Sequence, residues 1–312
     1  MSNQNIKKPL VTVCIVTYNS SEFILDALES VFEQTYQNIE LIVSDDCSKD
    51  NTVVVCEKWI NEHAYRFNHA EVVTTPKNTG VSANCNRGIR KGTGRFVKLF
   101  AGDDKLLPNC IEDNMAYMTA HPDTDIVFSD MYRFWSDDSE IELSSRLIYF
   151  KYLTPKEFKI YLLIQNFLPA PASFFRKELY IRLGGFNESI PMMEDKPFYI
   201  EALYSKCLMR YMPTPTVCYR IGNQSISQVR GSNKRNGLIE KSREKASKIV
   251  LGKLKEINYF LYLYQKNEYN YQFDSNVTNE VLHVLRFFNP FFYYVMYLFV
   301  KIRVIYYIKN HY

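Results

Sequence analysis

Residues 10–19 read LVTVCIVTYN, an apolar and β-branched run that ends in two polar residues. Such a run predicts a buried strand, because Val, Ile and Thr favour extended backbone and a strand covered on both faces is apolar throughout. A helical pattern follows, since Ile24, Leu28 and Val31 recur at intervals of three and four residues. The two segments together predict the first strand and the first helix of an α/β fold.

The same alternation continues through the first half of the chain. Four more apolar runs each follow a helix-like stretch, at residues 39–44, 70–75, 95–100 and 125–129. Strands that alternate with helices pair in parallel and bury both faces of their sheet under helices. We therefore predict an α/β fold with a Rossmann-like, mostly parallel central sheet and helices on both faces.

The pattern loosens after residue 130, and a polar, basic segment that starts near residue 228 marks a boundary. Before that boundary we expect a strand over 141–149, helices that start at Thr154 and near Glu194, and a strand over 208–221. The predicted regions are residues 1–227, with halves of about 10–130 and 131–227, and a basic, helical, aromatic-rich extension over 228–312.

Charge is spread unevenly behind the net value of +4. Residues 1–227 carry 24 Lys or Arg against 28 Asp or Glu, whereas residues 281–312 carry four cations, eleven aromatic rings and no acid. Rings and cations together suit an anionic membrane surface better than nucleic acid, and packing on protein is the alternative. The apolar run 287–300 falls short of the roughly 20 residues that span a bilayer. We expect peripheral membrane contact through 281–312 and no nucleic-acid partner.

The cysteines and the N-terminus favour a cytoplasmic setting. The seven cysteines are odd in number and form no CxxC pair, so reduced thiols are expected. The N-terminal residues MSNQNIKKP are polar and lack the apolar segment of a signal peptide. With the basic, aromatic C-terminus, these features predict a cytoplasmic protein at the inner face of the cell membrane.

Polar side chains follow each predicted strand at the point where the strand ends. Ligands of open α/β sheets bind at the carboxyl ends of the strands, so these side chains should face one crevice. No Walker A sequence or GxGxxG motif follows the first strand, which leaves phosphate to be held by a metal ion. The clusters are Tyr18 with Asn19, Asp45 with Asp46, residues 76–80, and Gly102 with Asp103 and Asp104.

Asp103 and Asp104 form the candidate metal site. They follow a predicted buried strand, where two adjacent carboxylates repel each other. A divalent cation removes that repulsion, and Mg²⁺ or Mn²⁺ is commonly held by one or two carboxylates and the phosphates of a substrate. The structural alternative is a turn in which Asp104 caps the helix that begins near Pro108.

Two other acidic pairs also have a capping alternative. Asp45 or Asp46 could accept a hydrogen bond from a nucleobase N–H, or cap the helix that begins near Asn51. Glu194 and Asp195 stand at a predicted helix start, where the helix dipole stabilises carboxylates. The functional alternative makes Asp195 a general base that removes a proton from an acceptor hydroxyl.

As a set, these motifs resemble the family-2 glycosyltransferases of GT-A fold. The resemblance spans about residues 10–227 and involves six segments in order: VTVCIVTYN, IELIVSDDCSKDNT, NTGVSANCNRGI, RFVKLFAGDD, PASFFRKELYIRLGGFNE and EDKPFYIEAL. The QxxRW motif of processive polysaccharide synthases is absent, since Trp59 and Trp135 lie too early in the chain. The resemblance therefore implies a non-processive enzyme of the bacterial surface-polysaccharide type.

The resemblance implies an inverting, metal-dependent transfer of a sugar from a nucleotide-diphosphate sugar, expected to be UDP-linked, to a hydroxyl of a saccharide or lipid-linked acceptor. By the same resemblance Asp195 is the catalytic base and Glu194 lies on the acceptor side. Asp104 and Asp103 would hold Mn²⁺ or Mg²⁺. The implied nucleotide- and donor-binding residues are Val16, Thr17, Tyr18, Asn19, Asp46, Asn78, Gly80, Asn86 and Asp103.

Three positions depart from the family pattern. Ala101 replaces the first acid of the metal motif, and Cys85 replaces an Arg that commonly precedes Asn86. Gly222 stands where relatives often carry His. These changes leave the Asp103–Asp104 pair as the ligands that the metal motif supplies.

Two other functions share parts of this pattern. A sugar nucleotidyltransferase has a similar sheet and similar metal chemistry, but it needs a Gly-rich phosphate loop directly after the first strand, which VTYNSSEF lacks. The second alternative is a non-catalytic protein that binds a nucleotide sugar and scaffolds partners at a membrane.

Overall fold

The computed structural model describes residues 8–135, 141–146, 150–151, 153–164, 166–222 and 237–257. The chain forms two compact units, Met1–Arg146 with Leu168–Ser242 and Leu147–Phe167 with Arg243–Tyr312. The predicted membrane-contacting region over 281–312 lies outside the described residues.

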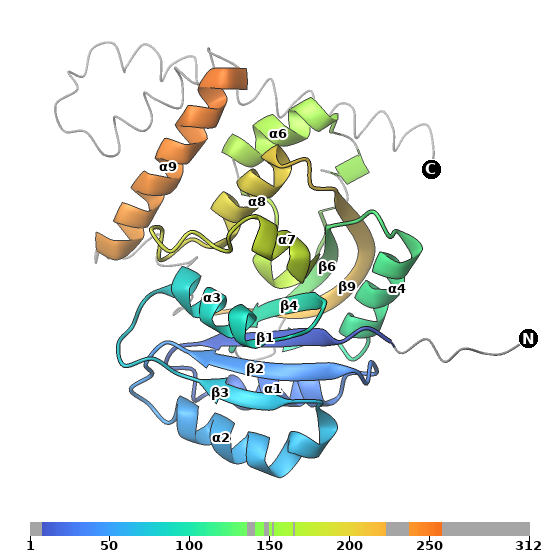
Figure 1. The fold of residues 1–312 in the computed structure, drawn as a ribbon, viewed down its shortest axis with the longest axis vertical. Helices are drawn as coiled ribbons and strands as arrows, with labels where there is room; N and C mark the ends of the chain where they lie inside the picture. Colours follow the sequence, from blue (N-terminus) through green and yellow to red (C-terminus); the bar gives the residue numbers. More distant parts are fainter. Residues whose placement is uncertain are drawn as a thin grey trace, which may run out of the picture. The chain divides into compact units, whose positions relative to one another are not determined.

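One sheet organises the first unit. Its described strands are β1 (Val11–Thr17), β2 (Ile39–Asp45), β3 (Ala70–Val73), β4 (Phe96–Ala101), β5 (Lys105–Leu106), β6 (Ile126–Trp135), β7 (Ile141–Ser144), β8 (Ser173–Arg176) and β9 (Met209–Ile221). Their order is β3-β2-β1-β4-β8-β6-β9-β5, with β7 paired to β6. Figure 1 shows β3, β2, β1 and β4 side by side in this order. β3, β2, β1 and β4 are parallel, as the alternation of strands and helices predicts. β8 is antiparallel to both β4 and β6, and β9 runs parallel to β6.

Helices and short 3₁₀ turns connect these strands. Those of the first unit are α1 (Ile24–Phe32), α2 (Thr52–His63), η1 (Ala64–Arg66), α3 (Val81–Lys91), α4 (Cys110–Ala120), η2 (Ala170–Ala172), α7 (Lys177–Arg182) and α8 (Asp195–Tyr204). The helix predicted to begin near Glu194 is therefore confirmed as α8, and the strand predicted over 208–221 as β9.

Alternate residues of β1 show which helices cover each face of the sheet. Val11, Val13 and Ile15 are fully buried in one core with apolar residues of α1, α2 and α4. Cys14 points to the opposite face, where its Sγ leaves no room for a side chain at Gly88 of α3. Because side chains alternate along a strand, helices cover both faces, and the predicted α/β architecture is confirmed.

The second unit contains α6 (Pro155–Ile164), and α9 (Gly237–Ile257) runs from the end of the first unit into the second. Thr154 and Glu157 form a reciprocal cap at the predicted start of α6. The Thr154 N–H donates to Glu157 Oε2 at 2.8 Å, and the Glu157 N–H donates to Thr154 Oγ1 at 3.3 Å. Over the part of the chain that the structure describes, no helix combines the length and apolarity needed to cross a membrane.

Candidate active site

Main-chain hydrogen bonds at the end of β1 bring three strand ends together. The Asp46 N–H donates to Thr17 O at 3.0 Å, and the Gly102 N–H donates to Val16 O at 2.9 Å. The Asn84 side chain on α3 also donates to Thr17 O, at 3.2 Å. The Thr17 hydroxyl is buried and has no hydrogen-bond partner among the described residues. The carboxyl ends of β1, β2 and β4 thus meet at one edge, where ligands of parallel sheets bind.

Tyr18 and Asn19 begin the loop that follows β1. Asn19 has a φ of 53°, in the left-handed region that Asn tolerates better than most residues. Its N–H donates to Ser48 Oγ at 2.8 Å, and its Oδ1 accepts the Lys49 N–H at 2.7 Å. These bonds tie the loop after β1 to the loop after β2, and they leave Tyr18 46% exposed at the sheet edge.

Asp46 is buried, with 3% of its surface exposed, and both of its carboxylate oxygens accept hydrogen bonds. The Thr79 N–H, the Thr79 hydroxyl and the Gly80 N–H donate to it over distances of 2.6 to 3.0 Å. Arg87 Nη2 lies 3.2 Å from Asp46 Oδ1. Asp46 therefore holds the 79–80 loop against the end of β2.

The other acidic residue of this pair has a local role. Asp45 Oδ2 accepts the Ser48 N–H at 2.8 Å, which closes a turn after β2. At the start of α2, the Thr52 N–H donates a hydrogen bond to Asp50 Oδ1 at 3.0 Å. Capping of α2 therefore falls to Asp50 and leaves Asp46 for the 79–80 loop.

Gly80 joins this loop to the segment that precedes the ED motif. It has a φ of 90°, and a Cβ at this position would lie 2.6 Å from Pro191 Cβ. Ser82, at the start of α3, donates its N–H to Pro191 O at 3.1 Å and its hydroxyl to Ile190 O at 2.6 Å. Asn78 is exposed at the beginning of the loop. The loop thus holds together two parts of the predicted site that are far apart in the sequence.

Asn86 is fully buried and joins α3 to the turn after α7. Its Oδ1 accepts the Tyr180 hydroxyl at 2.8 Å and the Phe186 N–H at 2.9 Å. Its Nδ2 donates to Phe186 O at 2.9 Å and to Glu188 Oε1 at 2.8 Å. All four hydrogen bonds of the Asn86 side chain are therefore made inside the protein.

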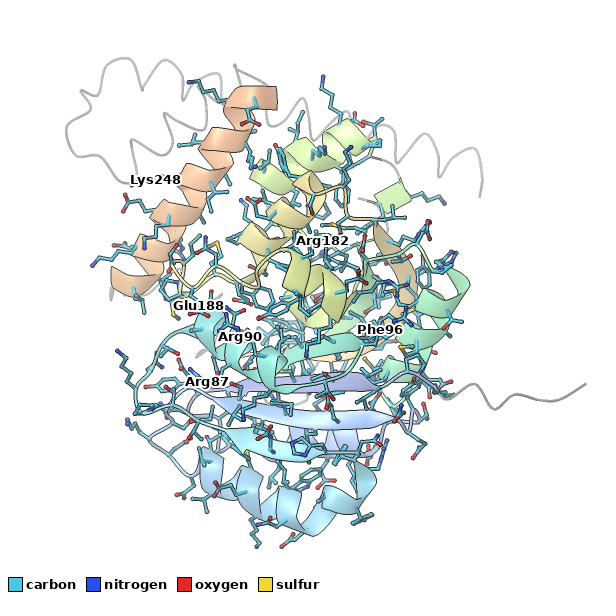
Figure 2. The ribbon with its side chains drawn as sticks, viewed as in Figure 1. Arg87, Arg90, Phe96, Arg182, Glu188 and Lys248 are labelled. Atoms are coloured by element: carbon cyan, nitrogen blue, oxygen red, sulfur yellow. The ribbon has the colours of Figure 1, made fainter. Side chains whose placement is uncertain are left out.

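An open hollow of about 540 Å³ lies beside α3, and it is lined by Thr79, Ala83, Arg87, Arg90, Lys91 and Glu188. Arg90 Nη2 lies 3.2 Å from Glu188 Oε1, and Figure 2 labels both side chains together with Arg87. Arg87 Nη2 also donates to the Thr79 hydroxyl at 2.7 Å. The hollow therefore adjoins the loop that Asp46 holds.

Asp104 is 1% exposed, and its Oδ1 accepts the Arg220 main-chain N–H at 2.8 Å. The Arg220 side chain donates from Nε to Asp103 O at 2.9 Å and from Nη2 to Asp26 Oδ2 at 2.8 Å. The Asp104 carboxylate thus bonds to β9, which differs from the predicted alternative of a cap on α4. One arginine contacts both members of the aspartate pair.

The electrostatics of this pair fit a divalent cation. Burial raises the pKa of Asp103. Burial and the Asp103 charge raise the pKa of Asp104 well above its ordinary value, against opposing effects of Arg220 and Lys98. Asp104 is buried and Asp103 is half-buried, and a bound cation stabilises two such neighbouring carboxylates as anions. No group of three His, Cys, Asp or Glu that could bind a metal occurs among the residues described.

Glu194 and Asp195 lie at the start of α8, and Glu194 makes no side-chain cap bond. Burial and the Asp195 charge raise the pKa of Glu194 to about 8. Burial lowers the pKa of Lys196 to about 8, partly offset by Asp195. Burial raises the pKa of the Cys85 thiol on α3, and the charges of Glu194 and Asp195 raise it further. Burial and the Asp195 charge therefore favour the protonated form of Glu194, which can donate a hydrogen bond.

Two arginines complete the site beyond the predicted residues. Arg87 contacts Asp46, and Arg220 contacts Asp103 and Asp104. Arg87 stands two positions after Cys85, the residue that this chain carries where family members commonly have an arginine. Local sequence pattern indicates neither the contact of Arg87 with Asp46 nor the contacts of Arg220 with the aspartate pair.

A match to a family now adds to this geometry. The sequence model described as Glycosyl transferase family 2 matches residues 12–184, more than half of the chain. The chain belongs to this glycosyltransferase family. The match covers β1 to β8 and the DD motif, and it ends before the ED motif.

Curated relatives agree with this assignment to family 2. The putative glycosyltransferase EpsH of Bacillus subtilis is 28% identical over 232 residues, which cover 72% of this chain and 64% of EpsH. The putative teichuronic acid biosynthesis glycosyltransferase TuaG of the same organism is 31% identical over 113 residues, or 36% of this chain and 42% of TuaG. The predicted membership of glycosyltransferase family 2 is confirmed. The chain spans about three fifths of the length of the first curated relatives that it matches.

Solved structures share the fold of this family 2 member. S. aureus TarS 1–349, in complex with UDP-GlcNAc, has a TM-score of 0.61 at 19% identity. The match covers 85% of this chain and 73% of the TarS chain. The mannosyltransferase PcManGT from Pyrobaculum calidifontis, in complex with GDP-Man and Mn²⁺, has a TM-score of 0.54 at 17% identity. The match covers 81% of this chain and 74% of PcManGT. These likenesses confirm the predicted GT-A fold.

Proposed function

We propose that this family 2 member transfers a sugar from a nucleotide-diphosphate sugar, UDP-linked, to a hydroxyl group with inversion at the anomeric carbon. The observation that carries the proposal is the meeting of β1, β2 and β4 at one edge, with the 79–80 loop joining Asp46 to the segment before Asp195. The catalytic region in this proposal is residues 1–227, with the nucleotide-sugar half over about 10–130.

The donor nucleotide would lie along the ends of β1 and β2. The exposed Tyr18 offers a face for base stacking, and Asp46 is the acceptor for a base N–H. Because the 79–80 loop already bonds to Asp46, a bound base would share this carboxylate with the loop donors. The remaining proposed donor contacts are Val16, Thr17, Asn19, Asn78, Gly80 and Asp103, while Asn86 holds α3 in position from inside the protein.

Asp104 and Asp103 would hold the divalent metal, Mn²⁺ or Mg²⁺, with substrate phosphates completing its ligands. Both residues follow β4 at the sheet edge, and their raised pKa values fit this role. When bound, such a cation supplies positive charge that stabilises the departing diphosphate. PcManGT carries Mn²⁺ in its complex with GDP-Man, which supports this choice.

Asp195 is the proposed general base. Its carboxylate takes the proton from the acceptor hydroxyl while the acceptor oxygen forms a bond to the anomeric carbon. The bond from that carbon to the diphosphate oxygen breaks on the opposite face, so configuration inverts and no covalent enzyme intermediate forms. Glu194, whose protonated form is favoured by burial and by the Asp195 charge, would donate a hydrogen bond to the acceptor. The acceptor is a saccharide or a lipid-linked sugar, and the enzyme acts in the cytoplasm at the inner face of the membrane.

The test uses the full chain, UDP-sugars with Mn²⁺, and detection of released UDP. We expect wild-type protein to release UDP, slowly to water and faster with an acceptor. Asp195→Asn should lose transfer by about 10²-fold or more while its affinity for UDP stays within about threefold. Glu201→Gln, on the exposed side of the same helix, is the matched control. UDP binding with no release under any condition would favour a non-catalytic binding protein, and release of pyrophosphate from UTP and a sugar phosphate would favour a nucleotidyltransferase.

A further inference from the structure

We propose that Arg220, on the strand that pairs with β5 directly after the aspartate pair, is the positioning residue that fixes Asp103 and Asp104 for cation binding. The proposal rests on the metal site of the proposed function. It concerns a residue outside the DD and ED motifs and outside the segment matched by the family model.

Arg220 contacts the two aspartates in two different ways. Its side-chain Nε donates to the main-chain oxygen of Asp103 at 2.9 Å, which fixes the backbone of the turn after β4. Its own main-chain N–H donates to Asp104 Oδ1 at 2.8 Å, which fixes the carboxylate itself. One residue of β9 therefore sets both the turn and the orientation of the side chain that follows it.

The guanidinium group is itself held on every side. Its Nη2 lies 2.8 Å from Asp26 Oδ2 on α1. The Phe23 and Phe134 rings lie 4.5 and 4.4 Å from its Cζ, one before α1 and the other on β6. Only 5% of Arg220 is exposed. Since planar stacking and a fork of donors are properties of arginine, lysine cannot reproduce this arrangement.

Asp26 extends the arrangement to the residue after the pair. Lys105 Nζ lies 3.1 Å from the same Asp26 oxygen, and it sits 5.2 Å from the centre of the Phe134 ring. Arg220 contacts the aspartate pair directly, and Lys105 follows the pair in the sequence. Both cations share one carboxylate, so Asp26 is the common anchor.

The carboxylate oxygens of the aspartate pair differ in their hydrogen bonds. Asp104 Oδ1 is occupied by the Arg220 N–H, which leaves Oδ2 to bind a cation. Among the residues described, no side chain or main-chain N–H of another residue donates to the Asp103 carboxylate. Arg220 thus contributes order, and the two aspartates contribute the oxygen ligands. Groups that orient metal ligands typically change metal affinity by about 10- to 100-fold when removed.

The test measures Mn²⁺ affinity directly, by electron paramagnetic resonance of free Mn²⁺, with and without UDP as a probe. Arg220→Gln and Arg220→Lys keep the main-chain bond to Asp104 but lose the bond to Asp103 O, and both should raise the Kd for Mn²⁺ by about tenfold. Asp26→Asn, which leaves the guanidinium in place, should raise it by less. The matched control is Arg66→Gln, because among the described residues the half-buried Arg66 donates hydrogen bonds only to main-chain oxygens between Phe32 and Gln37.

The control separates positioning from general stability. Arg66→Gln should lower the Tm as Arg220→Gln does, yet keep the Kd for Mn²⁺ within about twofold of wild type. Mn²⁺ binding by Arg220→Gln equal to that of wild type, or an equal loss in Arg66→Gln, would overturn the proposal. If Arg220→Gln does not fold, Asp26→Asn decides, and unchanged Mn²⁺ affinity in that variant would overturn it. Asp104→Asn tests the metal site alone: unchanged binding there would refute the metal site of the proposed function, and the role of Arg220 with it.

Discussion

Gly80 and Pro191 lie in direct contact, and a Cβ on Gly80 would come within 2.6 Å of Pro191 Cβ and 2.7 Å of Pro191 O. The contact joins the loop that Asp46 holds to the segment three residues before Glu194. The donor side and the acceptor side of the proposed site are therefore coupled through one glycine. Its φ of 90° adds a second reason why other residues are excluded there.

Gly80→Ala should destabilise the protein and weaken donor binding together. The added Cβ meets a rigid proline and main-chain atoms, so the loop must move away from Pro191. We expect a loss of about 2–4 kcal/mol in the free energy of unfolding, because steric overlap adds to the left-handed strain. The matched control is Gly184→Ala, since Gly184 has a φ of 79° but a Cβ added there would have no atom within 4 Å. Chemical denaturation of both variants checks this, and equal losses would show that the Pro191 contact carries no cost.

Asp46→Asn should loosen the 79–80 loop and lower the affinity for UDP. The neutral amide loses the charge that pairs with Arg87 at 3.2 Å, and one of its two ends becomes a donor facing the Thr79 and Gly80 N–H groups. We expect destabilisation of about 1–3 kcal/mol and a rise in the Kd for UDP of tenfold or more. Calorimetric titration with UDP measures the second effect. Asp50→Asn, which alters the cap of α2 nearby, should leave UDP affinity within about threefold.

Local sequence pattern predicted the first four strands because each is an apolar run next to a helical repeat. The segment LPAPASFF over 168–175 shows where this reasoning ends. Prolines disfavour a regular element there, yet the structure forms η2 and then the short β8, antiparallel between β4 and β6. Partners for so short a strand are chosen by the tertiary fold, which local periodicity does not record.

The candidate site shows the same division. Asp46, Asp104 and Asp195 were predicted because acids at strand ends and helix starts are visible in the sequence. The contacts of Arg220 were not, since its partners Asp104, Asp103 and Asp26 lie 116, 117 and 194 positions away along the chain. Likewise, the acceptors of the two Asn86 Nδ2 hydrogen bonds lie about 100 positions away along the chain. The sequence around Asn86 therefore does not predict its burial.

Stability should fall with rising pH because of Glu194. Burial and Asp195 raise the pKa of Glu194 from an ordinary value of 4.5 to about 8. Between these values the folded chain keeps a proton that the unfolded chain releases, so the free energy of unfolding decreases as pH rises and levels off above about 8. Gln does not titrate, so the free energy of unfolding of Glu194→Gln lacks this pH dependence. Its difference from that of wild type should therefore grow from pH 5 to pH 8, by up to about 1.4 kcal/mol per pH unit. Urea titrations at several pH values measure the difference, and Glu201→Gln, exposed on the same helix, controls for the loss of one carboxylate charge.

Asp104→Asn should stabilise the metal-free protein while removing its response to metal. Burial and the Asp103 charge raise the pKa of Asp104, which means that its ionised form opposes folding at neutral pH. An Asn retains an oxygen that accepts the Arg220 N–H at the same place but carries no charge. With chelator at pH 7 we expect the Tm of Asp104→Asn to equal or exceed that of wild type. Addition of Mn²⁺ and UDP should raise the Tm of wild type by mass action and leave the variant nearly unchanged. A variant that is both less stable in chelator and equally stabilised by Mn²⁺ would show that Asp104 serves the fold and that the cation binds elsewhere.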